Sequence, residues 1–444
     1  MITEPRRVLM IAAAFPPAGG SGVQRTLKFS KYLSRFGWRP IVWTVDHIDA
    51  LPVDESLCAE IPGDVEVHRR PHRFGKGPAG KLTDALQHAG PLGSRLANAA
   101  KWRIEKWNRK RAWPDEFAKW VEDSVEPLKA LIRERNVEAI YSTYSPSANH
   151  LLALKLKQAT GLPWVADFRD LWTDDLRYRE TDPKHHAANV QLEQDVLESA
   201  DAVVGVSPSQ TEVLAAHVPD ERAKFATITN GYDPADFEGV KRYKRVPGRP
   251  FTLSFVGRFD RQRADDDLFV ALQDFVDELG DNRDQFVFRI IGEFDTSTRR
   301  KLEEANIPYQ TTGYVSHKEA IQEMCSADAL LLTTDRGGPN ASTVICGKIF
   351  EYLASQRPIL IVGPEGWEGQ RLVERFSAGI ATPWNPEEIA TALHTLYKTS
   401  SAHGASSNNL DCISRITLTE SLAKTIEAVT PQRCNAKPMH AIAT

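Results

Sequence analysis

The hydrophobic positions of the chain fall into short, nearly continuous runs, with segments of helical spacing between them. Residues 8–15 form such a run, a helical pattern follows over 23–36 and ends at Gly37, and residues 40–45 form the next run. A short continuous apolar run is typical of a parallel strand that is buried on both faces. The chain is therefore predicted to open with a strand–helix–strand unit.

The same alternation continues in two series. Further apolar runs extend the first series, and a second series follows after a stretch rich in turn residues at 230–250; the runs lie at 138–143, 164–168, 202–206, 251–256, 286–291, 329–333 and 358–362. Two successive alternations of this kind predict an α/β protein with two Rossmann-like, doubly wound domains. We expect these domains to span residues 1–235 and 249–430, with a loose polar tail at 431–444.

Composition narrows the class of protein. The chain has 444 residues, 41% of them hydrophobic and 26% charged, with a formal net charge of -4. This balance is ordinary for a globular enzyme and indicates no general affinity for nucleic acid. The five cysteines are dispersed, without the close spacing of metal ligands, and no apolar run approaches the roughly 18 to 20 residues of a membrane span. We therefore expect a cytoplasmic protein with reduced thiols and no cysteine cluster for a metal.

Two loops at strand ends carry candidate binding residues. Gly20, Ser21 and Gly22 lie between the first strand and the first helix, where small residues let backbone N–H groups approach a phosphate. A tight structural turn is the alternative, because the loop is neither a Walker loop nor a GxGxxG motif. The strand at 329–333 is followed by a polar loop and a helix with Lys348, a combination that suits anions and sugar hydroxyls.

Five motifs occur in an order that resembles the family-4 glycosyltransferases, over about residues 7–428. They are Phe-Pro-Pro with Gly-Gly at 15–20, Asp-Phe-Arg-Asp-Leu-Trp at 167–172, Ile-Thr-Asn-Gly-Tyr-Asp at 228–233, Val-Gly-Arg at 256–258 and the segment 348–351. The resemblance implies the GT-B fold, with two Rossmann-like domains facing across a cleft. It also implies retaining transfer of a sugar from a nucleotide-diphosphate donor, without a metal or other cofactor. Residues 167–170 and 348–354 resemble the branch that builds bacterial surface polysaccharides, which implies a glycan or lipid-linked acceptor.

The resemblance assigns donor-binding roles to several of these residues. Glu351 would accept hydrogen bonds from the ribose hydroxyls, and the Gly20–Gly22 loop would border the pyrophosphate. Lys348 would either reach a phosphate or pair with Glu351. Thr343 stands where the family has a second Glu that contacts the transferred sugar, so the identity of that sugar stays open.

Two arginines are implied as catalytic groups. The family has Arg and then Lys, five positions apart, facing the pyrophosphate, and this chain has Arg258 and Arg263. Two guanidinium groups would stabilise the charge that develops on a leaving diphosphate. The alternative is a pair of surface arginines, and Arg261 between them leaves the register open.

The acceptor side is expected at the end of the strand at 164–168. Asp167, Arg169 and Asp170 are charged residues at this strand end, and Tyr144 with Ser145 follows the preceding strand. Asp170 could accept the proton of the acceptor hydroxyl, unless the departing phosphate does so. A structural Asp–Arg pair that holds the loop is the alternative.

Residues 69–111 are strongly basic and contain Trp102 and Trp107, with Trp113 just beyond. Such a segment suggests peripheral contact with anionic lipid at the inner face of the cytoplasmic membrane. A solvated helix whose tryptophans face the core is equally consistent with the pattern.

Two other functions stay open for the whole chain: a non-catalytic partner subunit with the GT-B fold, and a nucleotide-sugar epimerase of that fold.

Overall fold

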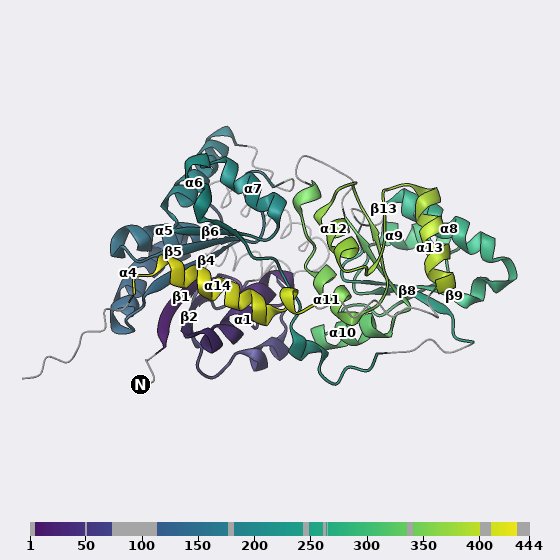
Figure 1. The fold of residues 1–444 in the computed structure, drawn as a ribbon, viewed down its shortest axis with the longest axis horizontal. Helices are drawn as coiled ribbons and strands as arrows, with labels where there is room; N and C mark the ends of the chain where they lie inside the picture. The colour runs from purple at the N-terminus through teal and green to yellow at the C-terminus, as the bar shows by residue number, and fades with distance from the viewer. Residues whose placement is uncertain are drawn as a thin grey trace, which may run out of the picture.

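Two parallel β-sheets, each covered by helices, form two lobes of the protein (Figure 1). The computed structural model describes residues 5–48, 51–72, 113–175, 182–242, 248–260, 263, 265–334, 341–399 and 410–432. The strand order is β3-β2-β1-β4-β5-β6-β7 in the first sheet and β10-β9-β8-β11-β12-β13 in the second. The predicted α/β architecture with two doubly wound domains is therefore confirmed.

The first sheet is built around β1, the first strand of the chain. Its strands are β1 (Arg6–Ile11), β2 (Trp38–Val45), β3 (Glu66–Arg70), β4 (Ala139–Tyr144), β5 (Trp164–Phe168), β6 (Ala202–Gly205) and β7 (Phe225–Thr227). Its helices are α1 (Ser21–Tyr32), α4 (Ala118–Glu134), α5 (Ala148–Thr160), α6 (Pro183–Ser199) and α7 (Pro208–Ala216). Because β1 pairs with β2 on one side and β4 on the other, the strand order reverses beside the Gly20–Gly22 loop. Ligands of open α/β sheets bind at this kind of switch point.

The second sheet repeats this plan around β8. Its strands are β8 (Phe251–Val256), β9 (Phe286–Ile291), β10 (Tyr309–Thr311), β11 (Ala329–Thr333), β12 (Ile359–Val362) and β13 (Gly379–Thr382). Its helices are α8 (Asp266–Leu279), α9 (Thr296–Glu304), α10 (His317–Ser326), α11 (Lys348–Ser355), α12 (Glu368–Arg375) and α13 (Pro386–Thr399). The central strands β8 and β11 are buried along their whole length, as their uninterrupted apolar sequences predict.

The last helix, α14 (Arg415–Val429), returns to the first domain and lies across it (Figure 1). Leu418, Leu422 and Ile426 are buried in the same core as Val8 and Met10 of β1. The sequence analysis placed residues 249–430 in the second domain, and for this helix that assignment is wrong. The apolar face of an amphipathic helix fits a core but does not identify which of two neighbouring cores it covers.

The two passages of the chain between the domains lie side by side. The backbone N–H of Tyr232 donates to the carbonyl of Ile413 at 3.2 Å, and the N–H of Arg415 donates to the carbonyl of Tyr232 at 2.7 Å. The outgoing and returning segments are therefore hydrogen-bonded to each other where they leave the first domain.

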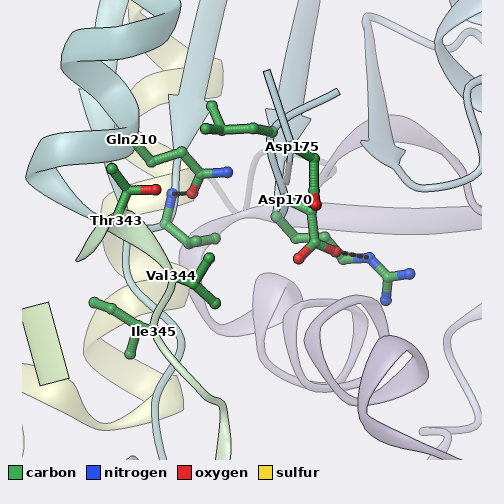
Figure 2. A pocket seen from close by; sticks show the side chains of 9 residues that line it. Asp170, Asp175, Gln210, Thr343, Val344 and Ile345 are labelled. Atoms are coloured by element: carbon green, nitrogen blue, oxygen red, sulfur yellow. Dashed lines mark hydrogen bonds and ion pairs between the residues drawn. The ribbon is translucent and has the colours of Figure 1, made fainter. Parts of the chain in front are cut away.

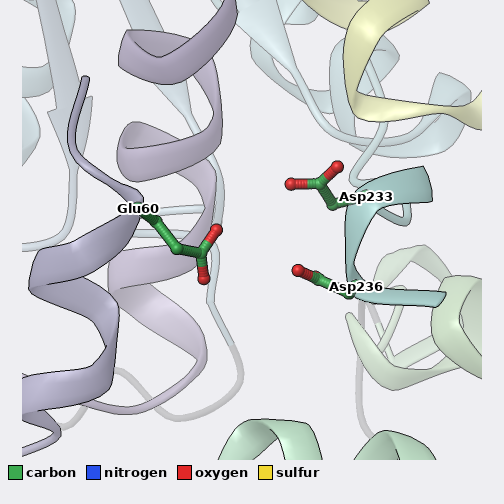
Figure 3. Close-up of side chains that lie close together, drawn as sticks. All are labelled: Glu60, Asp233 and Asp236. Carbon is green, nitrogen blue, oxygen red and sulfur yellow. The ribbon is translucent and has the colours of Figure 1, made fainter. Parts of the chain in front are cut away.

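Helix α1 is tied to the outgoing passage by a cluster of charged side chains. Glu60, Asp233 and Asp236 converge (Figure 3), and the buried ammonium of Lys28 lies 2.5, 2.9 and 2.9 Å from their carboxylates. Burial lowers the pKa of Lys28, but the three carboxylates outweigh burial and raise it above its usual value. Three carboxylates this close could hold a cation, and here the ammonium of Lys28, with that of Lys31, supplies the positive charge.

Candidate functional site

A pocket between the two domains brings together residues that are far apart in the sequence (Figure 2). The first domain contributes the ends of β5 and β6 and the first turn of α7, and the second contributes a short 3-10 helix and the residues after it. The lining residues are Arg169, Asp170, Leu171, Asp175, Val206, Gln210, Thr343, Val344 and Ile345. Three residues singled out from the sequence, Arg169, Asp170 and Thr343, thus lie in one site.

Arg169 connects this pocket with the start of α1. Its Nε and Nη2 donate to the carbonyls of Tyr144 and Ser145 at 3.0 and 3.1 Å. A Cβ atom at Gly22 would overlap the guanidinium, so Arg169 takes this position only because Gly22 has no side chain. The helix begins after Gly20, which has φ 94° and offers no side chain to cap the first N–H groups. The Arg169 charge and the amino end of α1 therefore add up to an electropositive place that suits an anion.

Asp170 is close to Arg169 but only loosely paired with it. Its Oδ2 lies 3.9 Å from Arg169 Nε, and about a third of the Asp170 side chain is exposed. Tyr144 packs beside them, with its ring stacked on Trp172 at a centroid distance of 5.4 Å. Burial, and then the charge of Asp170, raises the pKa of Tyr144 well above its usual value, so the phenol stays protonated. Tyr144 and Ser145 contribute to this site through the carbonyls that hold Arg169.

Asp167 differs from its neighbours in the same motif, because its carboxylate is fully buried. Arg25 of α1 forms a salt bridge with it at 2.6 Å, and the hydroxyls of Tyr141 and Thr143 donate to it at 2.6 and 3.1 Å. Arg25 also donates to the carbonyl of Ile228 at 2.9 Å. The expectation that Asp167 faces the acceptor differs from this geometry, in which every close partner of the carboxylate belongs to the domain interior.

The electrostatics of Asp167 follow from these partners. Burial opposes its charged form, but Arg25 and the two hydroxyls outweigh burial and hold the pKa of Asp167 below its ordinary value.

The sequence analysis did not identify Arg25. It lies three residues, about one helical turn, after Gly22, just as Asp167 and Arg169 lie two residues apart at the end of one strand. The Arg25–Asp167 pair therefore joins α1 to β5, and Arg169, the residue after β5, lies beside Gly22 on the same helix.

On the second domain, Lys348 lies at the carboxyl end of β8. Its ammonium donates to the carbonyl of Val256 at 2.7 Å and lies over the ring of Phe255. A Cβ atom at Gly257, which has φ 117°, would overlap the Lys348 side chain. Burial lowers the pKa of Lys348 below its usual value. Lys348 therefore lines the same strand end from which Arg258 projects.

Glu351 lies one turn further along α11 and pairs with a residue that the sequence analysis did not identify. Its Oε1 lies 2.9 Å from Nε2 of His317, the first residue of α10, and about a fifth of each side chain is exposed. Burial raises the pKa of Glu351, although His317 acts in the opposite direction. Only the position of His317 at the start of a helix, after the capping residue Ser316, could have drawn attention to it.

Arg258 and Arg263 meet at a shared carboxylate. Arg263 Nη1 lies 2.9 Å from Asp260 Oδ2, and Arg258 Nε lies 3.6 Å from the same atom. The Arg258 side chain is 75% exposed and that of Arg263 is 38% exposed. The structure thus groups the two guanidiniums at the end of β8, while Arg261 lies outside the described residues.

Part of the basic segment is also outside the described residues. Trp102, Trp107 and most of 69–111 belong to that part, as does most of the tail at 431–444. Trp113 is described and packs against the core of the first domain. Across the described ranges, no helix has both the length and the apolar content needed to cross a membrane.

Comparison with known proteins finds one domain-family model that matches part of the chain. Residues 20–231 match the glycosyl transferase 4-like domain. No curated protein sequence matches the chain.

Solved structures resemble the chain over nearly its whole length. The trehalose-6-phosphate protein of E. coli, bound with UDP-2-fluoro glucose, has a TM-score of 0.62 at 11% identity, over 96% of this chain and 100% of that one. HepE of Anabaena, in complex with UDP-glucose, has a TM-score of 0.58 at 14% identity, over 95% and 99%. A putative UDP-N-acetylglucosamine 2-epimerase of Listeria monocytogenes has a TM-score of 0.56 at 11% identity, over 96% of each chain. At these identities the likeness establishes the fold, which is GT-B.

Proposed function

We propose that this chain, whose residues 20–231 match the glycosyl transferase 4-like domain and whose fold is GT-B, is a retaining glycosyltransferase. It moves a sugar from a nucleotide-diphosphate donor to a glycan or lipid-linked acceptor in the synthesis of surface polysaccharide. The observation that carries the proposal is the pocket between the domains, where Arg169 and Asp170 of one domain meet Thr343 of the other. This arrangement lets two substrates bound to different domains meet at one place.

In this proposal, charged and polar groups of both domains hold the donor. The diphosphate lies between the amino end of α1, with Arg169, and the guanidiniums of Arg258 and Arg263. These fixed charges stabilise the leaving diphosphate, so the proposed reaction uses no metal and no other cofactor. Glu351 accepts hydrogen bonds from the ribose hydroxyls, and its bond to His317 holds the carboxylate in place.

Asp170 is the group we propose to receive the proton of the acceptor hydroxyl. It lines the pocket and is partly exposed, whereas Asp167 is enclosed by Arg25, Tyr141 and Thr143. A departing phosphate could take that proton instead, in which case Asp170 orients the acceptor. For a lipid-linked acceptor, we propose that the protein acts in the cytoplasm at the inner face of the cytoplasmic membrane.

Two observations favour other functions on the same fold. The structural likeness to a putative nucleotide-sugar epimerase supports an isomerase that needs no acceptor. The uncharged Thr343, where the family has a Glu, supports a partner subunit without activity.

A panel of nucleotide sugars, tested by thermal shift and then by product formation, separates the three functions. Transfer to an added acceptor, with release of nucleoside diphosphate, is the expected result. Conversion of a nucleotide sugar into its epimer without an acceptor would establish the epimerase. No shift with any nucleotide or nucleotide sugar would refute the transferase and leave the partner subunit.

A further inference from the structure

Gln210 lines the pocket between the domains from the first turn of α7, and the sequence analysis gave it no role. Only 3% of this residue is exposed. Its backbone N–H donates to the Ser207 hydroxyl at 3.1 Å, and its side-chain Oε1 accepts from the backbone N–H of Val206 at 3.2 Å. Backbone and side chain are therefore both fixed.

These bonds determine which end of the amide faces the pocket. A backbone N–H can only donate, so Oε1 must face Val206 and Nε2 must point the other way. Figure 2 shows this side chain directed into the pocket, toward the side that carries Asp170 and Asp175. Within the described ranges, Nε2 has no hydrogen-bond acceptor. Nε2 is not one of the fully buried polar atoms without a partner, so it reaches the pocket, where a ligand that brings an oxygen atom can accept from it.

The rest of the pocket identifies the chemical class of that ligand. A sugar hydroxyl can accept a hydrogen bond from an amide and donate one to a carboxylate, and the C–H face of a sugar ring packs on apolar side chains. The pocket provides both kinds of surface: Asp170, Asp175 and Thr343 are polar, and Leu171, Val206, Val344 and Ile345 are apolar.

We propose that Gln210 donates a hydrogen bond to a hydroxyl of the transferred sugar and so helps to select that sugar. The inference rests on the proposed function and deepens it, because Thr343 offers no charge to the sugar. The first domain then supplies polar contacts to the sugar, through Gln210 and the two aspartates. The Ser207 hydroxyl, which caps the helix of Gln210, also donates to the carbonyl of Thr343 at 2.9 Å. This bond joins the two domains beside the proposed sugar site.

Two variants of Gln210 test the proposal. Gln210→Glu keeps an oxygen for the Val206 N–H but replaces the donor with an acceptor, and Gln210→Met removes the amide at similar volume. Gln191→Glu is the matched control, because it makes the same change on the exposed face of α6. Calorimetry measures binding of UDP, GDP, UDP-glucose, UDP-galactose, UDP-N-acetylglucosamine and GDP-mannose to each protein.

We expect both Gln210 variants to bind the preferred nucleoside diphosphate within about twofold of the unmodified protein. Their affinity for the corresponding nucleotide sugar should fall by about 10- to 100-fold, since a site built to bond a hydroxyl discriminates strongly when that bond is lost. The Gln191→Glu control should match the unmodified protein in both measurements.

Three results would overturn the inference. Unchanged binding of the nucleotide sugar would show that Gln210 does not contact it, while the proposed function would stand. An equal loss of nucleoside diphosphate and nucleotide sugar would mean that the substitutions disturb the site as a whole. If the unmodified protein bound neither class of probe, the proposed function itself would fail.

Discussion

Replacing Asp167 with Asn should destabilise the first domain strongly, although the two side chains have nearly the same shape. The substitution removes the counter-charge of Arg25, whose guanidinium is buried and contacts Asp167 at 2.6 Å. Removing one partner of a buried ion pair typically costs about 3 to 5 kcal/mol, because the remaining charge stays buried without compensation. Tyr141 and Thr143 also lose an ionised acceptor for their hydroxyls.

Thermal unfolding followed by tryptophan fluorescence measures this effect. For a domain of this size, 3 to 5 kcal/mol corresponds to a melting temperature lower by about 6 to 20 °C. Asp170→Asn is the matched comparison, since it makes the same change three residues later, where about a third of the side chain is exposed. We expect it to lower the melting temperature by less than about 3 °C.

The pH dependence gives a second, independent measurement. Because the pKa of Asp167 is lower in the folded protein than in the unfolded chain, its contribution is present above the unfolded value of about 3.9 and is lost as pH falls through the folded value. The difference between the unmodified protein and Asp167→Asn should therefore persist above about pH 5 and shrink below about pH 4. Equal melting temperatures for Asp167→Asn and Asp170→Asn near pH 7 would refute the assignment of Asp167 to a structural ion pair.

Three further predictions concern the substrates and the membrane contact. Glu351→Gln should weaken nucleoside diphosphate binding, measured by calorimetry. Because burial raises the pKa of Glu351, the unmodified protein should lose affinity on acidification beginning above about pH 4.5, and the variant should not show this loss. Arg258→Ala and Arg263→Ala should each lower kcat by about 100- to 1000-fold with little change in KM; a change confined to KM would indicate uniform binding instead. Replacing residues 109–111 with Gln should reduce co-sedimentation with anionic vesicles at low salt while nucleotide binding persists, and absence of vesicle binding by the unmodified protein would rule out the membrane contact.

The central strands could be predicted from the sequence because each depends mainly on local hydrophobic content, whereas the partly exposed strands β3, β7, β10 and β13 were not predicted. The expected runs at 164–168, 251–256 and 329–333 coincide with β5, β8 and β11. A strand buried on both faces needs no information from distant residues to be identified.

The candidate site depended on distant contacts and was only partly predictable. The meeting of Asp170 with Thr343 requires the relative placement of two domains, about which the local pattern contains no information. Asp167 and Asp170 are the same residue type in one motif. Only the packing of Arg25 against Asp167 shows that Asp167 is the buried acid and Asp170 the partly exposed one. Gln210 was not identified because a Gln in the first turn of a helix is common and carries no motif of its own.

The position of α14 determines when the first domain can complete its core during synthesis. Leu418, Leu422 and Ile426 cover residues of β1, yet they leave the ribosome after the entire second domain. At about 5 to 20 residues per second, the roughly 180 residues between the first domain and α14 take roughly 10 to 40 seconds to synthesise. During that interval the nascent first domain exposes the apolar surface that α14 later covers. A fragment that ends before Arg415 would keep that surface exposed permanently, and adding residues 410–432 as a separate peptide should restore its solubility.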